Sequence, residues 1–367
     1  MESDVLVVGA GPAGIATAIA ASLKGLRVTV ADSRRPPIDK PCGEGLLPEA
    51  VKALECFGII LDSKRAFPLS GFRFSDESST ATALIAAGPA FGMRRTALHE
   101  RLVQRAMEVG VSFMWGAPVS EFRPGGARVG AAFVSCKWLV GADGQNSAVR
   151  KWAGLEPRGA RHSRFGFRRH YFISPWTDLV DVYWGERCQL FITPTAPEEI
   201  CVSVFSSDSR VRIDEALDQF PQVLRRLQGA RGAAPEQGAI TALDGARAVV
   251  RGRVALVGDA SCTVDGIAGQ GMSLAFQQAA HLAEALACED LSRYESAHRR
   301  ISILPARMTR LLLLMDRSTW LRKKALRLFA RKPEIFSRMI GMHTSGWTQE
   351  SFRARDMLDL SWKVLRA

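Results

Sequence analysis

The chain has 367 residues, of which 47% are apolar and 23% are charged. This composition is typical of a globular protein and excludes a fibrous or disordered one, and at roughly 150 residues per domain the length predicts about two domains. The net charge is +12, but 16 basic and 6 acidic residues lie between positions 294 and 367, so this segment alone carries +10. Because the rest of the chain is almost neutral, we expect no nucleic-acid partner.

The sequence contains no clear pattern for a signal peptide, a membrane span or a metal site. The first four residues contain no basic region of the kind that opens a signal peptide, and the apolar run at residues 311–315 is far shorter than the ~20 residues that span a bilayer. The seven cysteines are odd in number and form no Cys-x-x-Cys pair, and the six histidines show no ligand spacing. We therefore expect reduced thiols, a cytoplasmic location and no metal.

The first 32 residues predict a dinucleotide-binding unit. The apolar run at residues 4–8 is typical of a buried strand, and a helix at 13–23 and a second strand at 27–31 follow the glycine-rich turn. In that turn Gly9 allows the tight bend, Gly11 admits a pyrophosphate and Gly14 lets the helix pack closely. Asp32 ends the second strand, where an acid accepts hydrogen bonds from a ribose.

Two later segments carry a family resemblance. Residues 138–150, with Asp143-Gly144, and residues 254–275, with Gly258-Asp259, resemble the Asp-Gly and Gly-Asp motifs of the FAD-dependent aromatic hydroxylases. The wider superfamily includes para-hydroxybenzoate hydroxylase and the geranylgeranyl reductases. The resemblance implies an α/β fold: a Rossmann-type FAD-binding domain, an inserted antiparallel β-sheet substrate domain and a helical C-terminal segment. The expected boundaries are 1–65, 93–158 and 250–290 for the FAD-binding domain, 66–92 and 159–249 for the substrate domain, and 291–367 for the basic helical region.

The same resemblance implies further FAD contacts. Asp259 is expected to accept a hydrogen bond from a ribityl hydroxyl, Arg95 to contact FAD and Val119 to lie against the adenine. A helix that ends near residue 287 is expected to point its amino end at the flavin pyrimidine, where its dipole stabilises negative charge. The residues implied at that end are Gly269, Gly271 and Met272.

Residues 40–48 form a second glycine-rich segment, and no strand directly precedes it. It resembles the Cys-Gly segment of the geranylgeranyl reductases, which lies along the flavin. The resemblance places Cys42 and Gly43 at the cofactor and makes Cys42 and Glu44 candidate catalytic residues. The alternative is a turn that needs glycine flexibility and encloses a buried thiol.

The region from 160 to 250 predicts a substrate domain. Segments 164–173, 178–184, 189–193 and 199–205 read as successive antiparallel strands, and segments 70–74 and 80–85 read similarly. Their aromatic residues indicate an apolar pocket or plain core. Arg168, Arg169 and His170 meet a polar substrate group or face water, and we expect the second.

The motifs leave three functions open. The first is a monooxygenase that hydroxylates an aromatic or polyketide-like molecule through a flavin C4a-hydroperoxide. The second is a reductase or dehydrogenase of a C=C or C–C bond in an isoprenoid or other lipid-like substrate, which Cys262 and Asp265 favour because hydroxylases usually carry His where this chain has Cys262. The third is a flavin-binding partner protein without turnover. The flavin halogenases are disfavoured because their Trp-x-Trp-x-Ile-Pro segment is absent.

The electron donor is equally open. There is no second Gly-x-Gly-x-x-Gly, so we expect NAD(P)H as a transient reductant, a separate reductase, or reduction by the substrate itself.

The basic tail predicts helices that break near Pro305, Pro333 and Gly346. Its apolar residues fall largely on one helical face and its basic residues cover the rest. Such a helix lies on an anionic membrane surface or packs on the substrate domain, and we favour packing. The apolar face comprises Leu311, Leu314, Met315, Leu321, Ala325, Leu328 and Phe329.

Overall fold

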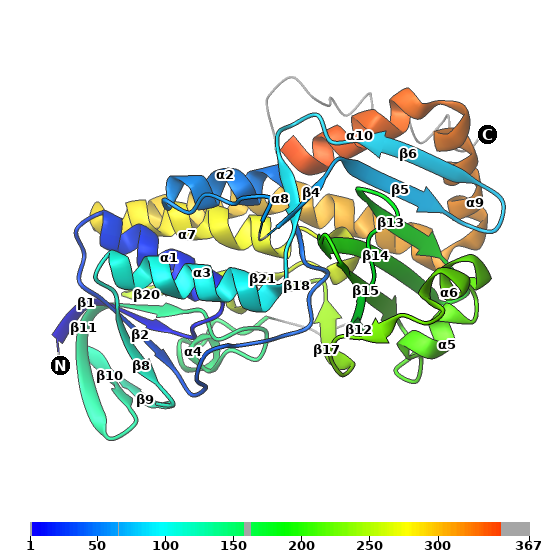
Figure 1. The fold of residues 1–367 in the computed structure, drawn as a ribbon. Coiled ribbons are helices and arrows are strands. Elements are labelled where there is room, and N and C mark those ends of the chain that lie inside the picture. Colours follow the sequence, from blue (N-terminus) through cyan, green and yellow to red (C-terminus); the bar gives the residue numbers. More distant parts are fainter. Residues whose placement is uncertain (1, 65, 158–162, 346–367) are drawn as a thin grey trace.

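The computed structural model describes residues 2–64, 66–157 and 163–345. Figure 1 shows one sheet covered by helices at the left of the view and a second sheet at the right, with long helices running between them. This mixed α/β arrangement with a helical C-terminal segment confirms the predicted fold class.

The first sheet has a parallel core in the order β20-β11-β1-β2-β8, with β19 and the β9-β10 hairpin paired antiparallel to it. Open parallel sheets bind ligands at the carboxyl ends of their strands, so the turn after β1 lies at the binding edge. The strands are β1 (Glu2–Val8), β2 (Val28–Asp32), β8 (Ser112–Trp115), β9 (Val119–Arg123), β10 (Gly126–Val129), β11 (Ala132–Gly141), β19 (Val250–Arg251) and β20 (Val254–Leu256).

Both faces of this sheet are covered, which explains the unbroken apolar run of β1. Val5 and Val7 pack in a core with helices α1 (Pro12–Leu23), α3 (Arg95–Glu108) and α7 (Gly271–Ala287). Leu6 and Val8 point the other way, into a smaller core with residues of β10 and β11. A strand buried on both faces needs apolar residues at consecutive positions, as predicted.

The second sheet has the order β16-β12-β15-β14-β13-β5-β6, with β17 beside β12. The predicted strands are present, and β13–β14 and β14–β15 pair in antiparallel succession as expected. The first strand differs from the prediction: β12 pairs with β15 instead of β13, and β13 pairs with β5 in parallel. Alternation of apolar residues identifies strands without giving their order. The strands are β5 (Gly71–Ser75), β6 (Thr80–Leu84), β12 (Ser163–Phe172), β13 (Leu179–Trp184), β14 (Cys188–Ala196), β15 (Glu199–Ser206), β16 (Arg231–Gly232) and β17 (Gln237–Ala242).

Short elements connect the two large sheets. Two small sheets are formed by β3 (Gly45–Leu46), β7 (Ala90–Gly92) and β4 (Phe67–Leu69), and by β18 (Asp244–Gly245) and β21 (Cys262–Thr263). The remaining helices before the tail are α2 (Pro48–Cys56), α4 (Ala148–Trp152), α5 (Ile213–Leu217), α6 (Pro221–Leu227), η1 (Gly258–Ala260) and η2 (Gly266–Ala268).

The tail forms α8 (Leu291–Arg317), α9 (Thr319–Arg331) and α10 (Pro333–Ser345). The predicted break at Pro305 is wrong, because α8 continues through it. A proline removes one helical hydrogen bond, and burial of Met308, Leu312 and Met315 in the apolar core against β5, β6 and β13 offsets that loss. The helix ends instead at Ser318, whose hydroxyl caps α9 by accepting a hydrogen bond from the Leu321 amide (3.2 Å). The predicted break at Gly346 lies outside the described residues.

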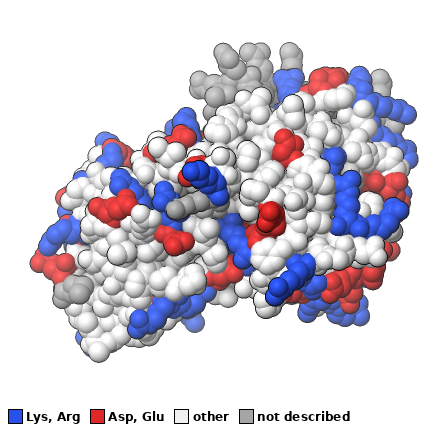
Figure 2. Space-filling model, in the orientation of Figure 1, with Lys and Arg blue, Asp and Glu red and all other residues white. Residues whose placement is uncertain are grey.

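Much of the apolar face predicted for the tail is buried in the protein. Met315, Ala325, Leu328 and Phe329 pack with residues of β5, β6 and β13, whereas Leu314 is 54% exposed. Figure 2 shows Lys and Arg side chains along the edge formed by α9 and α10, with Asp and Glu side chains among them. Among the described helices, none is both long enough and apolar enough to cross a membrane.

Candidate functional site

A cavity of about 830 Å³ is lined by residues of both large sheets and of the tail helices. It gathers fourteen of the fifteen cofactor-binding residues predicted from the sequence, and both catalytic candidates, Cys42 and Glu44. The fifteenth, Gly14, lies in the first turn of α1. The fourteen are Gly9, Gly11, Asp32, Cys42, Gly43, Arg95, Val119, Asp143, Gly144, Gly258, Asp259, Gly269, Gly271 and Met272.

The glycine-rich turn has the shape that a pyrophosphate needs. Gly9 has φ +105°, and a Cβ there would lie 2.4 Å from the Ala142 carbonyl oxygen. A Cβ on Gly14 would lie 1.9 Å from the Gly9 carbonyl oxygen. Gly11, by contrast, borders the cavity, and its nearest neighbour would be an Arg95 guanidinium nitrogen at 4.0 Å. Two glycines therefore permit the packing, and the third leaves space for a ligand at the amino end of α1.

Carboxylates hold the loops on either side of this turn. Asp32 accepts hydrogen bonds from the backbone amides of Ala10 and Arg34, both at 2.8 Å. Asp143 accepts hydrogen bonds from the Ser147 hydroxyl and from the Val149 amide (3.1 Å). Both acids fix backbone next to the cavity that they line.

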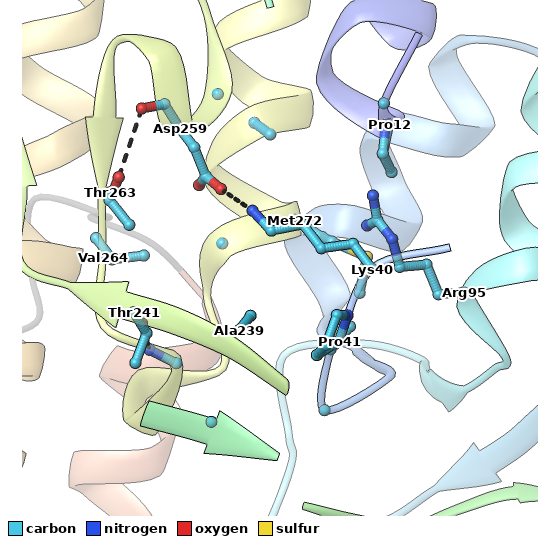
Figure 3. A pocket seen from close by; sticks show the side chains of 18 of the residues that line it. Pro12, Lys40, Pro41, Arg95, Ala239, Thr241, Asp259, Thr263, Val264 and Met272 are labelled. Atoms are coloured by element: carbon cyan, nitrogen blue, oxygen red, sulfur yellow. Dashed lines mark hydrogen bonds and ion pairs between the residues drawn. The ribbon is translucent and has the colours of Figure 1, made fainter. Parts of the chain in front are cut away.

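Arg95 begins α3 and is only 9% exposed. Its Nε atom is buried and has no hydrogen-bond partner among the described residues. A buried donor without a partner is costly, so this guanidinium fits an anionic group of a bound cofactor. Figure 3 shows Arg95 beside Pro12, at the start of α1.

Asp259 and Lys40, which both line the cavity, form an ion pair, with Lys40 Nζ 2.8 Å from Asp259 Oδ2 (Figure 3). Asp259 follows β20 in η1, and Lys40 lies in the Cys-Gly segment. Both side chains are more than one-third exposed. The pair marks a polar wall between the glycine-rich turn and the amino end of α7, which begins at Gly271.

Glu44 lies at the centre of a buried polar cluster. It has φ +61°, which is unusual for a residue other than glycine, and it is 1% exposed. Its carboxylate accepts hydrogen bonds from the Arg95 amide (3.0 Å), Arg168 Nη1 (2.6 Å) and the His170 ring (2.6 Å). With these partners Glu44 acts as a junction that joins the Cys-Gly segment to β12, and it has little capacity left to act as a free acid.

The expectation that the Arg168–His170 segment faces water is wrong for two of its three residues. Arg168 is 3% exposed and His170 is 2% exposed, and both side chains contact the buried carboxylate of Glu44. Arg169, on the opposite face of the strand, pairs with Asp214 at 2.6 Å. No sequence pattern indicates this cluster, because Glu44 lies more than 120 residues before Arg168 and His170.

Cys42 lines the cavity, and its sulfur accepts a hydrogen bond from the Glu44 amide (3.4 Å). Burial raises the pKa of the Cys42 thiol, so this group is protonated at neutral pH. The residue can therefore present a proton to a ligand, but it is a poor nucleophile.

Glu44→Gln tests the role of Glu44 as a junction. The amide keeps the shape of the side chain but removes the charge that faces Arg168, so we expect the free energy of unfolding in urea to fall by about 2–3 kcal/mol. Glu55, exposed on α2, provides the control Glu55→Gln, which we expect to unfold like the wild type. Equal unfolding midpoints for both variants would contradict the assignment.

The opposite side of the cavity is an apolar chamber. Four phenylalanines line it from β5, β14 and β15, and helices α8 and α10 add Met308, Leu312, Met339 and Ile340. Among the described residues of β5, β13, β14, α8 and α10, no Asp, Glu, Lys or Arg lines the cavity. The phenylalanines are Phe72, Phe74, Phe191 and Phe205.

The tail contributes a further polar group to this wall, which the sequence reasoning missed. His343 of α10 lines the cavity, and its ring lies edge-on to Phe72 with the centroids 6.2 Å apart. Burial lowers the pKa of His343 to about 4, so the ring is neutral at physiological pH. The last glycine-rich motif ends near residue 272. Nothing in the sequence after it indicates that His343 lies at the same cavity.

Similarity to known proteins agrees with this geometry. The family model described as FAD binding domain matches residues 2–293. Menaquinone reductase of Mycobacterium tuberculosis is 29% identical over 327 residues, covering 80% of this chain and 78% of that protein. Rifampicin monooxygenase of Rhodococcus hoagii is 32% identical over 159 residues, covering 41% of this chain and 33% of that protein.

A solved structure shares the whole fold. The flavoprotein/dehydrogenase from Cytophaga hutchinsonii superposes with a TM-score of 0.83 over 100% of this chain and 99% of that chain, at 14% sequence identity. The resemblance to the FAD-dependent monooxygenase superfamily is thus confirmed, with FAD as the cofactor. The chain belongs to the FAD binding domain family and is an FAD-dependent oxidoreductase.

Proposed function

We propose that this flavoenzyme is a monooxygenase that hydroxylates an apolar aromatic molecule. The chamber carries the proposal, because its four phenylalanines offer ring faces and edges on which an aromatic substrate packs. Phe191 and Phe205 already form an edge-to-face pair, with their centroids 5.4 Å apart. A charged substrate is disfavoured, because among the described residues β5, β13, β14, α8 and α10 place no charged side chain on the cavity, and Arg168 of β12, which does line it, is already paired with Asp39 and Glu44.

The proposed reaction balances with NAD(P)H as the electron donor. One oxygen atom of O2 enters a C–H bond of the ring as a hydroxyl. The other oxygen atom leaves as water, formed with the hydride of NAD(P)H, which carries two electrons and one proton, and with a second proton from solvent, and NAD(P)+ is released. Bound FAD supplies the oxygen activation. The chain orients the ring and excludes water with Phe72, Phe74, Leu312 and Ile340.

A second candidate is a reductase of a C=C bond in an isoprenoid-type substrate. Its support is the similarity to menaquinone reductase over 80% of this chain, together with the protonated Cys42 thiol at the cavity wall. Hydride addition to one carbon of a double bond requires a proton for the other carbon. In this candidate function the Cys42 thiol, which lines the cavity, is the proposed source of that proton.

Isotope labelling separates the two functions. With NAD(P)H, labelled O2 and a long-chain alkylphenol as the probe, we expect the phenol to stimulate NAD(P)H oxidation and to gain one labelled oxygen atom. Cys42→Ser is expected to keep this activity, with Cys56→Ser, an exposed thiol, as the matched control. Anaerobic reduction of menaquinone that fails in Cys42→Ser, without oxygen incorporation into the phenol, would contradict the monooxygenase and support the reductase.

A further inference from the structure

The outward side of α8 carries a surface that we call the basic stripe. Its residues are all exposed and are mostly three or four positions apart, so they share one side of the helix. The two acidic residues of the same helix, Glu295 and Asp316, are only partly exposed. The basic stripe comprises Arg293, Ser296, Arg299, Arg300, Ile303, Arg307, Arg310, Leu314 and Arg317.

Most of its charge is uncompensated. Within residues 2–64, 66–157 and 163–345, Arg293 is the only arginine of the basic stripe with an ion-pair partner, Asp290 at 3.3 Å. From Arg293 to Arg317 the helix extends roughly 36 Å at 1.5 Å per residue. The basic stripe is therefore long, and it offers five arginines to an external anionic surface.

Large apolar side chains lie among these arginines. Ile303 is 42% exposed and Leu314 is 54% exposed. Trp320, at the start of α9, is 56% exposed, and Lys324 Nζ lies 4.9 Å from the centroid of its ring. Arginines with exposed aliphatic residues and a tryptophan are typical of helices that lie in the headgroup region of a membrane. A nucleic-acid surface offers no apolar layer for Ile303 and Leu314.

The inward side of the same helix borders the chamber. Met308 and Leu312 line the cavity, whereas Arg307, Arg310 and Leu314 point outward. The helix thus separates the apolar chamber from the basic stripe by its own width. An enzyme docked on this side would hold its chamber close to a lipid surface, where apolar molecules concentrate.

We propose that the basic stripe, with Trp320, binds the surface of an anionic membrane. Arginines contact the lipid headgroups, and Ile303, Leu314 and Trp320 insert below them. The binding itself does not depend on which reaction the enzyme catalyses. Only the consequence that an apolar substrate enters from the membrane rests on the proposed function.

Vesicle co-sedimentation of the full-length holoenzyme tests the proposal. We expect binding to vesicles that mix phosphatidylglycerol with phosphatidylcholine, and little binding to phosphatidylcholine alone. The triple variant Arg307→Glu/Arg310→Glu/Arg317→Glu is expected to weaken binding to the anionic vesicles by on the order of a hundredfold, because each basic residue near such a surface contributes about 1 kcal/mol. Leu314→Ser with Trp320→Ser is expected to weaken it without changing the net charge.

The matched control reverses three exposed arginines of α6 and β16, in the variant Arg225→Glu/Arg226→Glu/Arg231→Glu. It makes the same change in net charge, and we expect it to keep more of its vesicle binding than the α8 variant. FAD absorbance and the unfolding midpoint show that each variant is folded. Equal loss of binding in both triple variants would overturn the proposal, as would wild-type binding to an RNA oligomer without binding to vesicles. Turnover is not part of the readout, so failure of the proposed function would leave this result unaffected.

Discussion

Gly14→Ala is expected to yield a protein that is strongly destabilised and does not retain FAD. The added Cβ would lie 1.9 Å from the Gly9 carbonyl oxygen and 3.0 Å from the Ala142 Cβ. These contacts force α1 away from β1, and overpacking of this kind costs about 1–3 kcal/mol. The same displacement moves the amino end of α1, where we expect the FAD pyrophosphate to bind. The measurements are unfolding in urea and the flavin absorbance that remains after gel filtration.

Gly11→Ala separates binding from stability. A Cβ on Gly11 would have no neighbour closer than 4.0 Å, but it would project where the cavity borders the turn. We expect near wild-type unfolding with reduced FAD retention. Gly232→Ala, which meets nothing within 4 Å, is the neutral control. Wild-type FAD retention in Gly11→Ala would contradict the position assigned to the pyrophosphate, and wild-type unfolding of Gly14→Ala would contradict the packing argument.

The gathering of the glycine-rich turn and the strand-end acids at one cavity is the part of the site that could be predicted best from the sequence. Gly9, Gly11 and Asp32 belong to one strand-turn-helix-strand unit, and the physical reason for each residue lies within that unit. Asp259 and Gly271 likewise sit at a strand end and a helix start. Such residues are predictable because short-range geometry fixes them.

The parts of the site and of the fold that could not be predicted from the sequence depend on contacts between distant segments. Glu44 meets His170 across 126 positions, and nothing in the alternation of β12 indicates that His170 has a buried partner. The parallel pairing of β5 with β13 and the return of His343 to the cavity have the same origin. Burial patterns show which residues turn inward but do not show which inward residues meet.

Arg164→Ala is expected to lower the free energy of unfolding by about 3–5 kcal/mol. Arg164 lies on β12, with its side chain 6% exposed, and its guanidinium holds Asp265 at 2.8 Å and Asp316 at 3.1 Å. These partners come from the loop before η2 and from α8, so one side chain joins the second sheet to two other segments. Removing it leaves two carboxylates, with side chains 1% and 9% exposed, without their shared cation.

The effect is expected to reach the cofactor. Asp265 accepts a hydrogen bond from the Ile267 amide (3.0 Å) and so caps η2, which leads directly to Gly269 and Gly271. If the Asp265 carboxylate moves, this loop moves with it, so Arg164→Ala should bind FAD more weakly as well as unfold earlier in urea. The free energy of unfolding of Arg164→Lys is expected to lie between those of the wild type and Arg164→Ala, because an ammonium cannot reproduce the two-pronged contact of a guanidinium. Arg123→Ala removes the exposed pair with Glu121 and should cost less than about 1 kcal/mol. If Arg164→Ala and Arg123→Ala unfold at the same urea concentration, the buried cluster does not join these three segments.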